Sequence, residues 1–403
     1  MDTGSSSSYI VQKPWSPVSP PRKGSGSGYG IARIPTAKCC DPVLPLHEHA
    51  STSHSSLRSQ VNDSEGVRSS VSNEYWPGTD SEDSDIGRAG RELKRQNTKS
   101  TSKTTGFFRS LAKKLGRTFN KRYDLFPNDQ KERDRNLAQH EIVLHVFDGK
   151  LHLAPLTHPR RVLDVGTGPG IWALWHIANQ KPEAKSNPSC TVVGVDVEPV
   201  RPPYTVSNCE FRTLDVREEW DFQEEFDFIH VRTLGQFPSD KFRKMLDTIY
   251  QNLAPGGWVE FTEWIMHLQS GDRSTDGTAF HSWNHNLRRG LHAINRSASY
   301  ATRYAPKLED AGFTNVTQRK FSIPINPWPP GEKLQHLGEM MSINVQGVVD
   351  PITVPIFLGI LGWTEEAVQA LLGQVFKDIV DTNLHAFMPL MTVFAQKPVE
   401  NPL

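Results

Sequence analysis

A glycine-rich segment follows a short apolar stretch near the middle of the chain. Residues 163–170 read LDVGTGPG and lie between a predicted strand at 160–166 and a predicted helix at 171–180. Glycine lets the backbone turn sharply, and it lets a ligand approach without a Cβ in the way. The carboxyl end of the first strand of an open α/β sheet is where nucleotide-like ligands bind. The segment therefore predicts a binding site for a ligand of that class.

The spacing of the glycines separates one nucleotide-like ligand from another. A dinucleotide fingerprint needs glycine at the position of Ile171, and a phosphate-binding P-loop needs a Gly-Lys-Ser/Thr that does not follow here. The remaining pattern, Asp-x-Gly-x-Gly-x-Gly, is typical of S-adenosylmethionine-dependent methyltransferases. This ligand has no pyrophosphate, but its cationic amino group and sulfonium suit the carboxylate of Asp164. We therefore predict S-adenosylmethionine as the cofactor.

Two further acids follow in the order that this ligand requires. Asp196 ends the next predicted strand, 26 residues after Gly170, where a carboxylate can accept both ribose hydroxyls. Asp215 follows the third predicted strand, where it can reach the adenine amino group. Either acid alone could equally cap a helix or shape a turn, so the prediction depends on their order. The predicted cofactor-binding residues are Asp164, Gly166, Thr167, Gly168, Gly170, Asp196, Val197, Asp215 and Val216.

No residue is assigned from the sequence as the catalyst. Methyl transfer is an in-line displacement in which positioning and desolvation supply much of the rate, so a dedicated base is not obligatory. The Asn-Pro-Pro-Tyr of amino-directed DNA and glutamine methylases does not follow the predicted strand at 226–232. The candidates near the acceptor are His230, Glu263, Asp276 and His281, and each has an ordinary structural interpretation. No Cys-x-x-Cys occurs, so no metal site is predicted.

Strand and helix signals alternate from residue 158 to residue 264. The alternation predicts a parallel sheet with helices on both faces, and two later strand signals predict an antiparallel edge pair. The fold class is therefore α/β and Rossmann-like, with a mostly parallel sheet of seven strands. Strands are predicted at 160–166, 191–197, 208–216, 226–232, 256–264, 316–325 and 387–398, and helices at 129–147, 171–180, 241–253, 278–301, 332–345 and 365–380.

The first part of the chain differs in composition from the rest. Its first 100 residues hold 20 serines and show no apolar periodicity, which predicts a disordered tail. We place this tail at 1–105, an N-terminal helical extension at 106–157 and the methyltransferase domain at 158–403. Residues 1–122 carry a net charge of +8 and the remaining 281 a net charge of −8. An acidic domain argues against a broad nucleic-acid surface, which leaves such contact at most to the basic tail.

A short basic amphipathic helix is predicted at 107–122, inside a stretch, 88–122, that holds 12 basic residues and one acid. Three interpretations stay open: the helix docks on the folded domain, contributes to a nuclear-import signal, or binds a lipid surface or a partner. No apolar run approaches 18 residues, and the N-terminus MDTGSSSSY has no apolar signal region. We therefore expect an intracellular protein without a transmembrane segment.

Beyond single motifs, the chain resembles the LaeA-like fungal methyltransferases over about residues 123–398. The glycine loop reads GTGPG where many members of that family read GCGTG, but every glycine is kept. The blocks that carry the resemblance are LFPNDQKERDR at 125–135, FDGKLHLAPL at 147–156, GVDVEPVRPP at 194–203, LAPGGWVEFTEW at 253–264, STDGTAFHSW at 274–283, LEDAGFTNVTQRKFSIPINPW at 308–328 and LHAFMPLMTVFAQKP at 384–398.

The resemblance implies a class I methyltransferase that regulates fungal development and secondary metabolism from the nucleus and cytoplasm. It implies a protein acceptor, chromatin-associated proteins included, and regulatory partners such as velvet-family proteins or another LaeA-like methyltransferase. Two other functions stay open: a cofactor-binding scaffold with weak or no turnover, and a small-molecule methyltransferase of secondary metabolism. The long basic tail favours regulation over metabolite chemistry.

Overall fold

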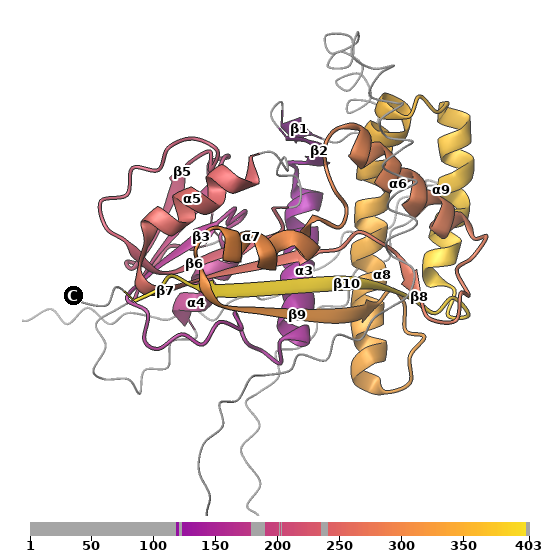
Figure 1. The fold of residues 1–403 in the computed structure, drawn as a ribbon. Helices are drawn as coiled ribbons and strands as arrows, with labels where there is room; N and C mark the ends of the chain where they lie inside the picture. The colour runs from indigo at the N-terminus through magenta and orange to yellow at the C-terminus, as the bar shows by residue number, and fades with distance from the viewer. Residues whose placement is uncertain are drawn as a thin grey trace, which may run out of the picture. The chain divides into compact units, whose positions relative to one another are not determined.

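The computed structural model describes residues 118–120, 123–178, 190–200, 202, 204–234 and 241–399 (Figure 1). All of them belong to one compact unit, Glu74–Leu403. The predicted tail at 1–105 lies outside the described residues, and so does most of the predicted helix at 107–122. At the end of that helix the prediction is wrong, because the backbone of β1 (Phe119–Asn120) pairs antiparallel with β2 (Tyr123–Pro127) instead of forming helical hydrogen bonds.

One mixed sheet organises the described part of the chain. Its strand order is β5-β4-β3-β6-β7-β10-β8, and β9 pairs with the other side of β10. The strands are β3 (Arg161–Val165), β4 (Thr191–Asp196), β5 (Cys209–Thr213), β6 (Phe226–Arg232), β7 (Leu253–Trp264), β8 (Gln269–Ser270), β9 (Thr314–Pro324) and β10 (Ala386–Gln396).

The strand pairing confirms the predicted fold class. The five strands from β5 to β7 run parallel, and β10 runs antiparallel to both β7 and β9. The described sheet has eight strands rather than seven, because the two-residue β8 also pairs with β10. The last strand of the chain thus lies between two earlier ones, which places β7 inside the sheet.

Helices cover both faces of the sheet and one of its ends (Figure 1). β3 and β4 are almost entirely buried, as expected of parallel strands that are covered on both faces. The helical elements are α3 (Gln130–Val146), α4 (Ile171–Ala178), α5 (Phe242–Asn252), α6 (Ala279–Ala293), η1 (Tyr300–Arg303), α7 (Tyr304–Asp310), α8 (Glu332–Thr353), η2 (Val354–Ile360, a π-helix) and α9 (Glu365–Val380).

A separate apolar core joins α3 to the C-terminal helices α6, α8 and α9. Leu337, Met341, Val345 and Val349 of α8 lie in this core. The continuous helical segment Glu332–Ile360 is long and apolar enough to cross a membrane by length and composition, and 61% of its apolar window is buried inside the protein. Packing in the core therefore accounts for the hydropathy of this helix.

Candidate cofactor and acceptor site

A cavity of about 940 Å³ opens at the carboxyl ends of the parallel strands and extends beneath α3, α6 and α8. One part is lined by the glycine loop and by the residues that follow β4 and β5. The other part lies against the C-terminal helical core and is lined by apolar side chains: Trp264, Met266, Trp283, Met341, Val345, Val348, Ile352 and Met388. The cavity thus offers a polar compartment joined to an apolar one.

The glycines of the loop have different tasks. Gly168 has a φ of +56°, lines the cavity and would place an added Cβ in open space, so its backbone is accessible to a ligand. Gly170 has a φ of +80°, and a Cβ there would lie 2.6 Å from the ring of Phe211. Gly170 does not line the cavity. The absence of a Cβ at this position makes room for the ring of Phe211, which differs from the predicted close approach to the ligand.

Asp164 anchors the loop from the end of β3. Its Oδ2 accepts a hydrogen bond from Thr167 Oγ1 at 2.6 Å, and its Oδ1 accepts one from His230 Nδ1 at 2.7 Å. His230 stacks on Trp172, with ring centroids 3.8 Å apart and the planes within 3°. Burial lowers the pKa of His230, which favours the neutral imidazole beside the Asp164 side chain. The arrangement places a fixed, buried carboxylate at the wall of the cavity.

Asp196 connects the loop to the neighbouring strand. Its Oδ2 accepts from Gly168 N at 2.9 Å, and its Oδ1 accepts from Glu198 N at 3.2 Å. Burial raises the pKa of Asp196. Asp196 and Val197 both line the cavity, where the ribose is predicted to bind. The carboxylate therefore fixes the backbone of Gly168 in addition to facing the ligand space.

The predicted contact of Asp215 with adenine is not supported by its placement. Arg217 grips both carboxylate oxygens, with Nε 2.8 Å from Oδ1 and Nη2 2.6 Å from Oδ2. Leu214, Val216 and Arg217 line the cavity, whereas Asp215 does not. An arginine two residues away can fold back onto the acid, and in this structure the Asp215 carboxylate is engaged by Arg217, so its contact with adenine stays a prediction without structural support.

The four catalytic candidates divide into two pairs. His230 and Glu263 line the cavity, and both are buried. Asp276 and His281 do not line it, so the structure gives these two predictions no support. Asp276 pairs with Arg273 at 2.7 Å on an exposed turn. His281 lies in the first turn of α6, where its backbone N–H donates to the N-cap Thr278.

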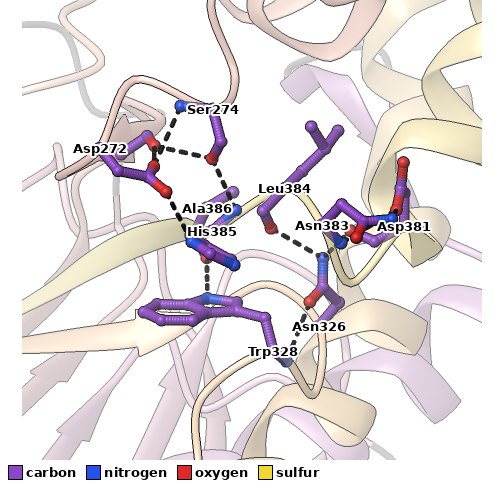
Figure 2. Close-up of polar contacts among 10 residues, drawn as sticks. Asp272, Ser274, Asn326, Trp328, Asp381, Asn383, Leu384, His385 and Ala386 are labelled. Carbon is purple, nitrogen blue, oxygen red and sulfur yellow. Dashed lines mark hydrogen bonds and ion pairs between the residues drawn. The ribbon is translucent and has the colours of Figure 1, made fainter.

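The block that contains Asp276 instead fastens the C-terminal strand (Figure 2). Ser274 Oγ accepts from the backbone N–H of His385 at 2.8 Å, and Asp272 Oδ2 lies 2.6 Å from His385 Nδ1. The ring of Trp328 stacks on His385. Because the serine contacts the backbone of His385 and not its imidazole, these residue types do not form a nucleophilic triad.

Three residues that line the cavity were not predicted from the sequence: His140, Arg232 and Thr233. His140 of α3 accepts a hydrogen bond at Nδ1 from Arg232 Nη2 at 2.8 Å, across 92 residues of sequence. Burial lowers the pKa of His140 to about 2. Thr233, directly after β6, has a φ of +57°, which is strained for a β-branched residue and is a feature of functional sites. Backbone strain and a contact of such long range leave no pattern in the sequence.

The entry block at 125–135 positions α3 over the cavity. Asp129 caps the helix by accepting from Glu132 N at 3.1 Å. Arg135 then joins α3 to α8, because its Nη1 donates to Asn344 Oδ1 at 2.9 Å while its Nη2 donates to Glu132 at 2.7 Å. The block therefore holds α3 in place against α8 where the two helices line the cavity.

The residues of the polar compartment fit S-adenosylmethionine. A buried carboxylate, Asp164, suits the cationic end of this ligand, and the open space beside Gly168 admits it to the backbone. The described residues contain no cluster of histidine, cysteine or acidic side chains that could hold a metal ion.

Comparison with known proteins agrees with this fit. Residues 133–318 match the model of a methyltransferase domain. The chain is 32% identical to methyltransferase pytC of Aspergillus terreus over 275 residues, which cover 68% of this chain and 83% of that protein. It is 30% identical to protein-methionine methyltransferase laeA of Emericella nidulans over 278 residues, 68% and 72% of the two chains. It is 29% identical to secondary metabolism regulator laeA of Aspergillus fumigatus over 294 residues, 71% and 76%.

The fold and the site define an S-adenosylmethionine-dependent methyltransferase of class I. The chain belongs to the LaeA-like family of fungal methyltransferases.

Proposed function

We propose that this chain methylates a protein acceptor and thereby regulates secondary metabolism and development. The observation that carries the proposal is its 30% identity to a protein-methionine methyltransferase across 68% of the chain. Entry into the nucleus through the basic residues 88–122 and assembly with other regulatory proteins, such as velvet-family proteins or another LaeA-like methyltransferase, belong to the same proposal. The long basic extension before the domain supports a regulatory role.

A methionine thioether is the acceptor that we propose. When bound, the cofactor supplies an electrophilic methyl group on a sulfonium. The apolar compartment, with Met341 and Met388 on its wall, suits a neutral, weakly solvated side chain. A thioether has no proton to lose, so no base is needed at the acceptor atom. His230 agrees with this, because its Nδ1–H is committed to Asp164 and burial lowers its pKa.

A small-molecule methyltransferase of secondary metabolism is the second candidate. The 32% identity to pytC favours it. The apolar compartment could equally receive a compact metabolite, since buried apolar walls with few polar groups are typical of small-molecule sites.

Transfer of a labelled methyl group separates these functions. The full chain is incubated with methyl-labelled S-adenosylmethionine and either protein extract or metabolite extract, with Asp164→Ala as the inactive control and Asp272→Asn as the active one. We expect the label in protein, and we expect peptide mapping to locate it on a methionine side chain. Label in metabolites alone would support the second candidate. Cofactor binding without any labelled acceptor would instead indicate a scaffold with weak or no turnover.

A further inference from the structure

Arg232 lines the cavity, and none of the predicted cofactor contacts involves it. It ends β6, and His230, two residues earlier, is the register partner of Asp164 on β3. Side chains two apart on a strand point to the same face. Arg232 and Asp164 are therefore neighbours on one face of two adjacent strands, and both line the cavity.

The guanidinium of Arg232 lacks an anionic partner within the described residues. Its one hydrogen bond there is from Nη2 to His140 Nδ1, at 2.8 Å. Burial lowers the pKa of Arg232 to about 10, and the carboxylates of Asp164 and Glu260 oppose that shift without forming an ion pair with it. A buried cation is costly unless an anion and hydrogen bonds compensate it, so this site calls for an acceptor that comes from the cavity.

His140 fixes the direction of the guanidinium. Arginine can only donate, so His140 Nδ1 must accept and its proton must lie on Nε2. Burial keeps this ring neutral, since it lowers the pKa to about 2. His140 therefore accepts one N–H of Arg232 without neutralising the guanidinium, whose positive charge stays available to a ligand.

We propose that Arg232 binds the carboxylate of the methionyl end of S-adenosylmethionine, while Asp164 faces the amino group. Both groups are attached to one carbon of the cofactor, so the residues that bind them must be neighbours, as Asp164 and Arg232 are. An anionic acceptor could supply a carboxylate as well, but the proposed thioether carries none. At this step the inference rests on the proposed function, and comparing intact with decarboxylated cofactor in the absence of any acceptor tests it separately.

A ligand that lacks the carboxylate tests this contact directly. Calorimetry measures the affinity of the full chain for S-adenosylmethionine and for decarboxylated S-adenosylmethionine, which keeps the amino group and the sulfonium. The variants are Arg232→Gln, Arg232→Lys and, as a matched control, Arg212→Gln, which removes an exposed arginine paired with Glu210. Because the readout is a ratio of two affinities for one preparation, partial unfolding of a variant does not distort it.

We expect wild-type protein to prefer the intact cofactor by about 10- to 150-fold, the value of one charge-assisted contact. Arg232→Gln should lose this preference, Arg232→Lys should keep part of it, and Arg212→Gln should keep all of it. The proposal is overturned if Arg232→Gln retains the wild-type preference, or if it weakens both ligands equally, which would indicate a structural role. Equal binding of both ligands by wild-type protein, or binding of neither, would overturn it as well.

Discussion

Two aspartate–histidine pairs occupy opposite environments in this molecule. Asp164 and His230 lie 2.7 Å apart at the cavity, and their side chains are only 3% and 2% exposed. Asp272 and His385 lie 2.6 Å apart at the base of β10, and their side chains are 48% and 42% exposed (Figure 2). Both pairs use the histidine Nδ1, so their local geometry is nearly the same.

The difference between the pairs lies in what surrounds them. Burial holds His230 neutral, and its stacking on Trp172 fixes the ring, so the pair sets a single carboxylate at the cavity. The pKa of Asp272 is lowered chiefly by the backbone N–H of Ser274 and by the hydroxyls of Ser270 and Ser274. The first pair lines the cavity, and the second joins two segments of chain. An aspartate–histidine distance therefore does not reveal function without its surroundings.

Replacing the acid of the buried pair should have the largest effect. Asp164→Ala leaves His230 Nδ1–H buried without an acceptor, which should lower the free energy of unfolding by about 1–3 kcal/mol. It also removes the carboxylate predicted to face the cofactor amino group and the anchor of Thr167, so cofactor affinity should fall more than about 100-fold. Denaturant unfolding and calorimetry measure the two effects. Retention of wild-type affinity would show that Asp164 serves the fold alone.

The next effect concerns Asp196, which faces the same cavity. Asp196→Ala removes the predicted acceptor for the ribose hydroxyls and also releases the N–H of Gly168. Cofactor affinity should fall by about 10- to 150-fold, with a smaller change in stability than for Asp164→Ala because the freed N–H faces the cavity. Calorimetry on the variant measures the loss. Unchanged affinity would mean that the ribose lies elsewhere.

The sequence was sufficient where the fold and the cofactor class follow from local pattern. Alternating strands and helices predicted the sheet, and the spacing of glycines with Asp164 and Asp196 predicted the cofactor loop. It was less informative where a nearby arginine pairs with a candidate acid, as Arg217 does with Asp215 and Arg273 does with Asp276. It was also silent on Arg232 and His140, because only folding brings α3 onto the end of β6.

The pH dependence of stability that arises from buried His176 should be a smaller effect. Burial lowers the pKa of His176, beside Trp172, from 6.5 to about 4. Between these values the unfolded chain binds a proton that the folded chain does not, so stability falls as the pH falls through 6.5 toward 4. Relative to pH 7, wild-type protein should lose about 2 kcal/mol at pH 5 through this group.

His176→Phe keeps a ring of similar size and removes this titration. Its free energy of unfolding, measured by urea denaturation, should therefore decline less than that of wild-type protein between pH 7 and pH 5. The difference between the two pH profiles reports the contribution of His176 alone. This separation is needed because burial raises the pKa of Glu260 to about 7, so that Glu260 stabilises the folded state as the pH falls. Parallel pH profiles would show that His176 is solvated in the folded state.

The exposed pair should give the smallest effect. Asp272→Asn keeps the shape of the side chain but removes its charge, and an exposed polar contact of this kind contributes little to stability. The folded-state pKa of Asp272 is lowered, so its contribution is complete above the ordinary value of 3.8 and is lost as the pH falls through the folded value. The Tm of the variant should lie slightly below that of wild-type protein at pH 7, and the two should converge in acid. Cofactor affinity should not change; a loss comparable to that of Asp164→Ala would show that the cluster at the base of β10 is coupled to the cavity after all.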